Sequence, residues 1–343
     1  MPPTAPPAPP ARMRAVVYDR YGPPEVLRCE DAPVPAPGDG EVLLAVHAAG
    51  VNPREWHFVR GTPYALRPLF GLARPRARRL GVDAAGVVAA VGRGVTRLAP
   101  GDAVFGTARG AFAEYACAAE AALVPLPPAV AFAQAAAVPT AALTALQGLR
   151  AGGLPAGQPP TPRVLVNGAA GGVGTFAVQL ARTFGAAVTG VCSTSNTALV
   201  RSLGAEHVVD YTRDDVTAAA EHRGRYDLLL DCVGNRPLAA CARVLRPGGT
   251  YVAVGGPDGR WVGPLPRMLA VRARPAAGGR RRVPLVTRRS ADDLRLLRDL
   301  LAAGRVTPVL DRRYALADAA AAVRYVEAGH ARGKVILTVH GAA

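Results

Sequence analysis

A glycine-rich turn constrains this chain more than any other feature. It lies in the stretch VLVNGAAGGVGTFAVQLARTFGA at 164–186. Residues 164–166 are apolar and predict a short buried strand. After the turn, apolar residues recur at helical spacing and would give a helix one apolar stripe; they are Val173, Phe176, Ala177, Leu180, Ala181 and Phe184. The stretch therefore predicts a strand, a tight turn and a helix in succession.

Three small residues of the turn, Ala169, Gly171 and Gly174, match a G-x-G-x-x-G pattern with alanine in its first position. The second position must be small so that the backbone can approach a pyrophosphate, and the third lets helix and strand pack closely. Free N–H groups at the start of the helix would face the phosphates. A tight turn without a ligand is the alternative, but the flanking strand and helix favour a dinucleotide-binding loop.

The end of the next predicted strand indicates which dinucleotide binds. A fold that prefers NAD usually carries Asp or Glu there, about 20 residues after the turn. Here the stretch AAVTGVCSTSN at 186–196 ends in hydroxyl and amide side chains, with Arg201 nearby and no carboxylate. This pattern favours NADP, while NAD stays possible and a plain polar loop is the other interpretation.

The size and the cysteines of the chain bound its class. Its 343 residues, half of them hydrophobic, suffice for two domains with their own cores. The five cysteines contain no C-x-x-C pair, which indicates a reducing compartment without disulfides or a zinc cluster. No apolar run reaches the ~20 residues of a membrane span, and the Pro-rich start lacks the apolar segment of a signal peptide. We therefore expect a cytoplasmic protein without a transmembrane segment.

The formal net charge is +16, and almost all of the positive charge is arginine because Lys334 is the only lysine. Two arginine clusters stand out, at 72–80 and 271–289. Contact with acidic lipid or RNA is one interpretation. We favour a solvated surface that attracts an anionic cofactor, and we expect no specific nucleic-acid partner.

The chain predicts two kinds of architecture in turn. Residues 1–12 form a Pro-rich tail that we expect to be disordered, and Met13 opens the fold and is a candidate natural start. From there to about residue 130 short strands alternate with Gly and Pro turns, which predicts an all-β unit in the form of a partly open barrel. A helix is expected over 131–153, and we place the end of this first domain at residue 135.

From residue 136 strands alternate with helices, which predicts right-handed βαβ units and a parallel sheet. The expected strands lie near 164–167, 187–192, 207–210, 227–231 and 249–254, with helices at 197–205 and 236–245. This domain ends at 290 and includes a basic segment at 258–289. The part from 291 to 343 contains a helix at 291–304 and a strand at 333–339, which we expect to return to the first domain.

Nine motifs in order resemble the zinc-independent branch of the medium-chain dehydrogenase/reductase superfamily, in its quinone oxidoreductase and ζ-crystallin-like group, with the subgroup akin to the reticulon-4-interacting protein the nearest. They are AAGVNPREWHFVRG, GVDAAGVVAAVG, GDAVFG, GAFAEYA, AAVPTAALTALQGL, NGAAGGVG, GAEHVVDYT, YDLLLDCVGN and HARGKVILTV. The resemblance implies an α/β protein with a GroES-like β-barrel catalytic domain and a Rossmann domain with a doubly wound parallel sheet. It also implies NADP(H) as cofactor.

The same resemblance bears on zinc. Where the zinc-dependent branch carries a cysteine ligand, this chain has Asn52, and where that branch carries Gly-His-Glu it has Gly81, Val82 and Asp83. Only three residues separate the motifs that would flank a four-cysteine lobe. We therefore expect no zinc. Since no metal would lower the pKa of an alcohol, a quinone or an α,β-unsaturated carbonyl is the better substrate.

The resemblance suggests catalytic residues at five positions. Asn52 would face the cleft, Thr144 would approach the nicotinamide, and Arg60 could stabilise negative charge. His57 stands where related quinone reductases have tyrosine, so it is either a proton donor or a structural histidine beside its aromatic neighbours. Tyr64 is a second candidate donor or a packing residue.

Further residues are expected at the cofactor. Gly171, Gly172, Val173 and Gly174 would cradle the pyrophosphate, and Lys334 could reach the cofactor or the domain interface, with a surface salt bridge as the alternative. The remaining candidates follow strand ends: Asn167, Ser193, Asn196, Tyr211, Cys232, Val233 and Gly255. Ser193 and Asn196 match the region of the 2′-phosphate, although related enzymes often have lysine in place of Asn196.

Three functions remain open. The first is an NADPH-dependent reductase of quinones or enones, expected as a homodimer that pairs through the sixth strand of the sheet. The second is a dedicated biosynthetic enoyl or ketone reductase, which a helix within 258–285 would favour if Trp261, Leu265, Met268 and Leu269 faced inward. The third is a cofactor-binding interaction protein that contacts RNA or a membrane surface.

Overall fold

The protein is described here by a computed structural model that covers residues 9–154, 160–256, 259–263, 265–273 and 277–340. The chain divides into two compact units, one formed by residues 1–140 and 289–343 and the other by residues 141–288. Most of the Pro-rich tail lies outside the described residues, so the prediction of disorder there is untested. In the described part, no helix is long and apolar enough to cross a membrane.

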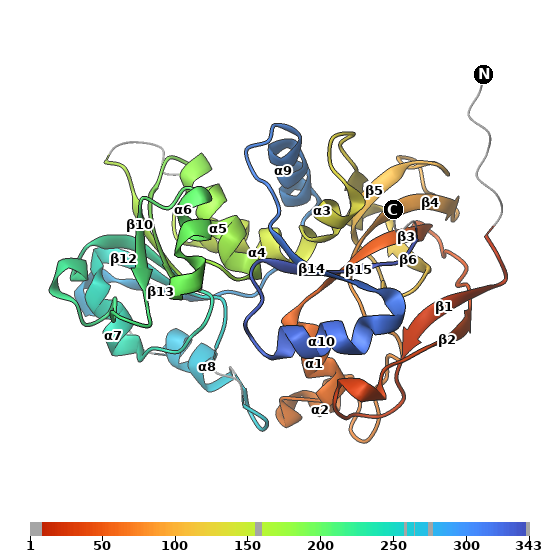
Figure 1. Ribbon diagram of the computed structural model, residues 1–343, viewed down its shortest axis with the longest axis horizontal. Coiled ribbons are helices and arrows are strands. Elements are labelled where there is room, and N and C mark those ends of the chain that lie inside the picture. Colours follow the sequence, from red (N-terminus) through yellow and green to blue (C-terminus); the bar gives the residue numbers. More distant parts are fainter. Residues whose placement is uncertain (1–8, 155–159, 257–258, 264, 274–276, 341–343) are drawn as a thin grey trace. The chain divides into compact units, whose positions relative to one another are not determined.

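The first unit is built mainly on a seven-stranded sheet (Figure 1). Its strands run in the order β14-β15-β3-β4-β5-β7, with β6 paired to β3, and a separate pair is formed by β1 and β2. The bounds are β1 (Arg12–Val17), β2 (Arg28–Pro33), β3 (Glu41–Val51), β4 (Asp83–Val91), β5 (Ala103–Thr107), β6 (Tyr115–Ala119), β7 (Leu123–Pro125), β14 (Leu310–Ala315) and β15 (Lys334–Thr338). The segment after residue 289 thus supplies two strands of this sheet.

The central strand β3 is buried along most of its length because β4, β6 and β15 all pair with it. Gly86 lets β4 approach, since a Cβ there would stand 2.0 Å from the Ala45 carbonyl oxygen. The core behind the sheet includes Tyr18, Leu44 and Phe112, each at most 2% exposed.

The prediction of an all-β first domain was wrong at one place that matters for function. Helix α1 (Pro53–Arg60) follows β3 directly, and α2 (Arg67–Phe70) comes after it. Pro53 is pre-organised for the first helical position, and the Glu55 carboxylate accepts from the Asn52 N–H at 2.8 Å, as in a capping box. Figure 1 shows α1 beside α10 (Ala319–Glu327).

The single helix predicted over 131–153 is in fact two helices, α3 (Phe132–Ala136) and α4 (Pro139–Ala151). The break falls before Pro139 because proline has no N–H to donate and disfavours the helical conformation of the residue before it. Helix α9 (Ala291–Ala302) lies in the predicted place and begins at Ser290, whose hydroxyl accepts from the Asp293 N–H.

The second unit contains a six-stranded sheet in the order β10-β9-β8-β11-β12-β13, all of it parallel. This confirms the doubly wound sheet predicted from the sequence. The strands are β8 (Arg163–Asn167), β9 (Ala187–Cys192), β10 (His207–Asp210), β11 (Tyr226–Asp231), β12 (Leu245–Ala253) and β13 (Arg281–Pro284). The order reverses between β8 and β11, which is where ligands bind in sheets of this kind.

Four helices connect these strands: α5 (Gly172–Thr183), α6 (Thr197–Ser202), α7 (Leu238–Val244) and α8 (Leu265–Ala273). Because the chain moves outward from β8 in one direction and from β11 in the other, right-handed crossovers place α5 and α6 on one face and α7 and α8 on the other (Figure 1). The apolar stripe of α5 is buried, with Phe176, Ala177 and Leu180 fully enclosed.

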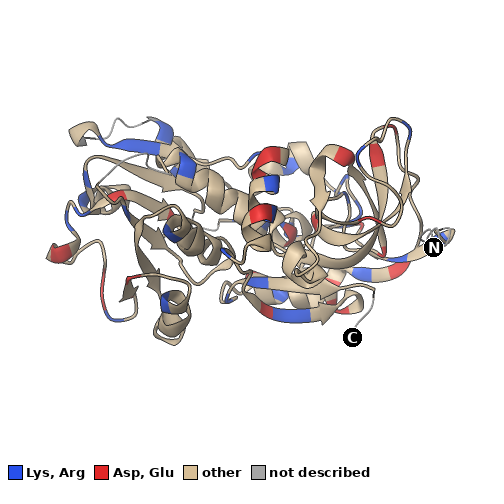
Figure 2. Ribbon diagram, turned by 90° about the horizontal axis from the view of Figure 1, so that it is seen from above, with Lys and Arg blue, Asp and Glu red and all other residues tan. Residues whose placement is uncertain are grey.

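Helix α8 forms within the basic segment, but two of the side chains that would have to face inward to favour a large apolar substrate are exposed. Trp261 is 74% exposed and Leu269 is 65% exposed, while Val271 of α8 is buried. Residues 258, 264 and 274–276 of this segment lie outside the description. Figure 2 shows lysine and arginine on helices and strands of both units.

Candidate functional site

The predicted dinucleotide loop has the geometry that a pyrophosphate requires. Gly171 precedes the first turn of α5, and no described side chain caps that helix end. A Cβ on Gly174 would stand 2.0 Å from the Gly168 carbonyl oxygen, so this position admits only glycine. A Cβ on Gly171 would meet only that same oxygen, at 3.4 Å, so the space beside it is open. The amides of Gly172, Val173 and Gly174 start the helix, where a phosphate fits.

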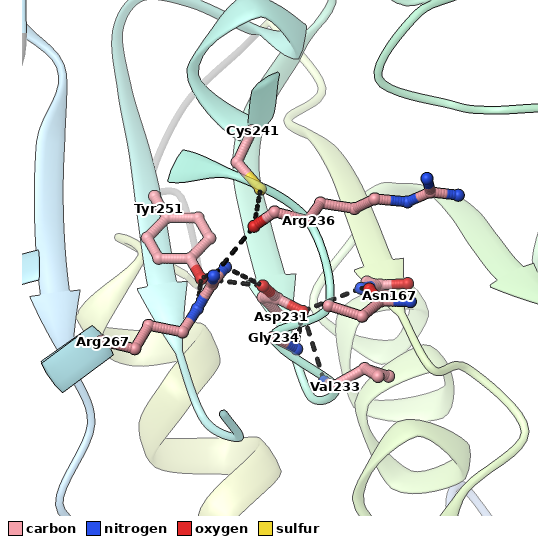
Figure 3. Close-up of polar contacts among 9 residues, drawn as sticks. Asn167, Asp231, Val233, Gly234, Arg236, Cys241, Tyr251 and Arg267 are labelled. Atoms are coloured by element: carbon pink, nitrogen blue, oxygen red, sulfur yellow. Dashed lines mark hydrogen bonds and ion pairs between the residues drawn. The ribbon is translucent and has the colours of Figure 1, made fainter. Parts of the chain in front are cut away.

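Asn167 and Asp231 meet where the strand order reverses (Figure 3). They end β8 and β11 and are paired in register. The Asn167 amide donates to Asp231 Oδ1 at 2.8 Å, and the same oxygen accepts from the N–H groups of Val233 at 3.2 Å and Gly234 at 2.8 Å. Asp231, which is fully buried, therefore shapes the loop in which Cys232 and Val233 were predicted to border the cofactor.

The second oxygen of Asp231 is held from α8 and β12 (Figure 3). Oδ2 accepts from the Tyr251 hydroxyl at 2.7 Å and from Arg267 Nη2 at 2.9 Å. Burial, together with the nearby Asp231 charge, raises the pKa of Tyr251 far above its ordinary value, so this hydroxyl stays a donor. Sequence reasoning missed all three residues; an acid at the end of a predicted parallel strand was the one available signal, for Asp231.

Gly255 lies beside this loop as predicted from its position after β12. Its N–H donates to the Asp231 carbonyl oxygen at 3.2 Å, and a Cβ there would stand 2.4 Å from the Cys232 carbonyl oxygen. The backbone after β12 therefore approaches the backbone after β11 so closely that only glycine fits at position 255.

The structure corrects the expectation that no carboxylate stands near the ribose end of the site. Asn196 Nδ2 donates to Ser193 Oγ at 3.0 Å, so these two predicted residues do meet. Between them Thr194 donates its hydroxyl to Asp210 Oδ2 at 2.5 Å, from the end of β10. Hydrogen bonds from Thr194, and then from Thr212, hold the pKa of Asp210 below its ordinary value. Asp210 escaped notice because it comes from the neighbouring strand.

A small pocket of about 20 Å³ lies at these strand ends. Its lining includes Asn167, Val191, Tyr211 and Asn235. Tyr211 is half exposed and its N–H donates to the Cys192 carbonyl oxygen at 3.0 Å. The contact of Tyr211 with the adenosine end stays a prediction. Thr144 lies elsewhere in this unit, on α4, where its hydroxyl is 2.9 Å from the Thr287 hydroxyl.

In the first unit the structure brings Asn52 and Lys334 together in a buried polar cluster. Lys334 Nζ donates to Asn52 Oδ1 and, at 3.2 Å, to the Val51 carbonyl oxygen. Asn52 Nδ2 donates to Asp83 Oδ2 at 3.1 Å. Lys334 and Asn52 are each 3% exposed and Asp83 is fully buried. Lys334 is thus neither a surface residue nor part of a surface salt bridge.

Burial also acts on the charges of this cluster. It raises the pKa of Glu55 to about 7, with Asp83 adding to the rise. It lowers the pKa of Lys334, while Asp83 and Glu55 oppose that change. The Glu55 carboxyl in the folded protein therefore loses its proton near pH 7, well above the range of an ordinary glutamate.

The other predicted catalytic residues of the first unit are held by neighbours. Arg60 forms a two-pronged ion pair with Glu327 of α10, so its charge is already compensated. His57 stacks on Trp56 with ring centroids 3.5 Å apart. Tyr64 lies in a 3-10 helix (Tyr64–Leu66), and the Arg67 guanidinium sits 4.5 Å from its ring centre. In the residues described, no group of three or more His, Cys, Asp or Glu could hold a metal ion.

Comparisons with known proteins agree with this architecture. A family model described as an alcohol dehydrogenase GroES-like domain matches residues 38–128, and one described as a zinc-binding dehydrogenase matches residues 203–337. A chloroplast envelope quinone oxidoreductase homolog from Arabidopsis thaliana is 34% identical over 95% of this chain and 98% of its own. An NADPH-dependent alkenal/one oxidoreductase from the same plant is 33% identical over 96% of this chain and 80% of its own.

The solved structure of a quinone oxidoreductase from Coxiella burnetii matches with a TM-score of 0.83 and 30% identity, over 96% of this chain and all of that one. The chain therefore belongs to the medium-chain dehydrogenase/reductase family, in its quinone oxidoreductase branch. The predicted GroES-like and Rossmann-type domains are confirmed.

The two glycines of the turn allow a paired test. Gly171→Ala should fold normally and weaken binding of a dinucleotide by about tenfold, equivalent to about 1.4 kcal/mol, because the methyl group fills the phosphate approach. Gly174→Ala should instead lower the free energy of unfolding by about 1–3 kcal/mol, because its methyl group meets backbone. Fluorescence titration and urea unfolding measure the two effects. If the two variants lost the same binding affinity and the same unfolding free energy, the turn would not have the predicted role in dinucleotide binding.

Replacing Arg267 by methionine should cost about 3–5 kcal/mol of unfolding free energy, because it leaves the buried Asp231 without its cation. Tyr251→Phe is the matched control and should cost only about 1 kcal/mol, the contribution of one hydrogen bond. Urea unfolding of both variants measures the difference. If Arg267→Met lowers the free energy of unfolding no more than Tyr251→Phe does, the ion pair with Asp231 is not needed for stability.

Glu55 should make stability depend on pH. Its pKa is raised in the folded state, so the folded protein binds more protons than the unfolded one between pH 4.5 and about 7. The contribution of this group is full below pH 4.5 and is lost as the pH rises through about 7. Glu55→Gln keeps an acceptor for the Asn52 N–H and should remove this slope. Urea unfolding across pH 5–8 tests this, and an unchanged slope in the variant would contradict it.

Proposed function

We propose that this chain is an NADPH-dependent, zinc-independent reductase of quinones or α,β-unsaturated carbonyls. The open amides at the start of α5, beside the Asn167–Asp231 pair, are the observation that carries the proposal. They offer donors to a pyrophosphate at the reversal of strand order. The quinone and alkenal/one oxidoreductases among the relatives support the substrate class.

The residues of the second unit would hold the cofactor. Gly172, Val173 and Gly174 would donate N–H groups to the pyrophosphate, and the loop held by Asp231 would border the bound molecule. The half-exposed ring of Tyr211 is the candidate for packing on the adenosine end. Ser193 and Asn196 are the candidates for the 2′-phosphate. The partly buried Asp210 carboxylate lies close by, and its negative charge works against that phosphate, so NADH remains a second cofactor to test.

The chemistry requires little of the protein beyond orientation. The cofactor, when bound, would supply a hydride to a carbon made electrophilic by conjugation, and a proton from solvent would complete the reduction at oxygen or at the adjacent carbon. Asn52 is the donor that we assign to the substrate oxygen. Arg60 is left out of this role because Glu327 engages it. His57 and Tyr64 remain candidates for relaying the proton.

We also propose that the enzyme works as a cytoplasmic homodimer. Strand β13 pairs only with β12 within the described residues, which leaves one edge to pair with a second copy. The five free cysteines suit a reducing compartment. The alternative within this proposal is a reductase with one dedicated biosynthetic substrate. A screen of candidate acceptors would distinguish it from a general quinone or enone reductase.

The experiment compares NADPH and NADH by fluorescence titration and then follows their oxidation with a quinone, an enone and a saturated ketone. We expect tighter binding of NADPH, turnover with the quinone or enone, and no turnover with the ketone. Activity should survive dialysis against a chelator. Turnover that stops on chelation would overturn zinc independence, and binding of neither nucleotide would overturn the proposal as a whole.

A further inference from the structure

Lys334 is unusual both in the sequence and in the structure. It is the only lysine in a chain with 41 lysine and arginine residues. It is also 3% exposed, at the start of β15. An ammonium group removed from water is costly unless it has partners. Every other basic residue among the lysines and arginines is an arginine, which indicates that this position requires the compact ammonium group of lysine.

The contacts of Lys334 show why arginine does not suit this position. Its Nζ donates to two acceptors, the Val51 carbonyl oxygen and Asn52 Oδ1. A guanidinium group is planar and brings five N–H donors, so most of them would be left without an acceptor inside the protein. The backbone around the position is also tight, since a Cβ on Gly333 would stand 2.3 Å from the Val309 carbonyl oxygen.

The same contacts determine how the Asn52 amide is oriented. An ammonium group can only donate, so the atom it meets must be the amide oxygen. At the other end the amide nitrogen donates to Asp83 Oδ2 at 3.1 Å. Asp83 is itself fixed by Thr140, whose N–H donates at 3.1 Å and whose hydroxyl donates to Oδ1 at 2.6 Å. The Asn52 amide therefore lies between a cation and a carboxylate, and it cannot flip to exchange the positions of its oxygen and nitrogen.

Among the described residues, only one of the two hydrogens on Asn52 Nδ2 has an acceptor, which is Asp83 Oδ2. An ammonium bonded to the amide oxygen polarises the amide and makes the other N–H a stronger donor. We propose that Lys334 is a positioning residue for the reduction, which holds and polarises the Asn52 amide so that its remaining N–H binds the substrate oxygen as negative charge develops there. The inference rests on the proposed function, because Asn52 meets a substrate only if the chain is that reductase.

The test is a double-mutant cycle in the full-length enzyme. Asn52→Ala should lower kcat by about a hundredfold to a thousandfold, as expected for the loss of one donor to a developing negative charge. Lys334→Met should lower kcat by a smaller factor, because Lys334 acts through Asn52. The Kd for NADPH should stay within about twofold in both variants. In the double variant kcat should fall no further than in Asn52→Ala alone, since Lys334 acts through Asn52. Losses that multiply would instead mean that Lys334 has a general structural role.

Ile336→Val, a fully buried change in the same strand, is the control for lost stability and should leave kcat unchanged. A second measurement avoids altering Lys334. Labelling with ¹⁵N-lysine gives one side-chain ammonium signal, because the chain has one lysine. That signal should shift in Asn52→Ala, and an unmoved signal would contradict the contact.

The outcomes separate the two proposals. If the wild-type enzyme binds NADPH but reduces no acceptor, the proposed function fails and this inference fails with it. If the wild-type enzyme is active and Lys334→Met folds and keeps its full kcat, the inference alone is wrong.

Discussion

A carboxylate taken out of water must be compensated, and this constraint shapes both units of the chain. Asp83 and Asp231 are each fully buried. Asp231 is surrounded by two backbone amides, an asparagine, a tyrosine and an arginine. Asp83 receives bonds from Asn52 and Thr140 and lies near the Lys334 cation. In both cases the compensation fixes backbone or side chains that the proposed reaction uses.

The two solutions differ in how the cation is supplied. The Arg267 guanidinium donates directly to Asp231 at 2.9 Å, and it also donates to the Tyr251 hydroxyl and to the Arg236 carbonyl oxygen. This places α8 over the end of the sheet and ties the basic segment to the nucleotide loop. Lys334 instead contacts the amide between itself and Asp83, so its charge acts through Asn52. One arrangement fixes a loop, while the other orients a single hydrogen-bond donor.

Local patterns predicted much of the fold. Glycine spacing, apolar runs and amphipathic periodicity act over a few residues, so they predicted the turn at 168–174, the strand at 187–192 and the helix from residue 291. The break at Pro139 and the start of α1 at Pro53 had local signals too, which were overlooked. The contacts within the candidate site could not be predicted in this way. Asp210 approaches Thr194 across 16 residues, and Lys334 approaches Asn52 across 282, so sequence spacing carries no sign of either contact.

The burial of the one lysine has a consequence for the chemistry of the whole surface. Reagents and enzymes that acylate, methylate or cross-link lysine find no exposed lysine side chain on the folded chain, because Lys334 is 3% exposed. The Lys334 side chain can therefore be modified only after the first unit opens. Lysine modification by such a reagent would then report the opening of the sheet around β15, without any engineered probe.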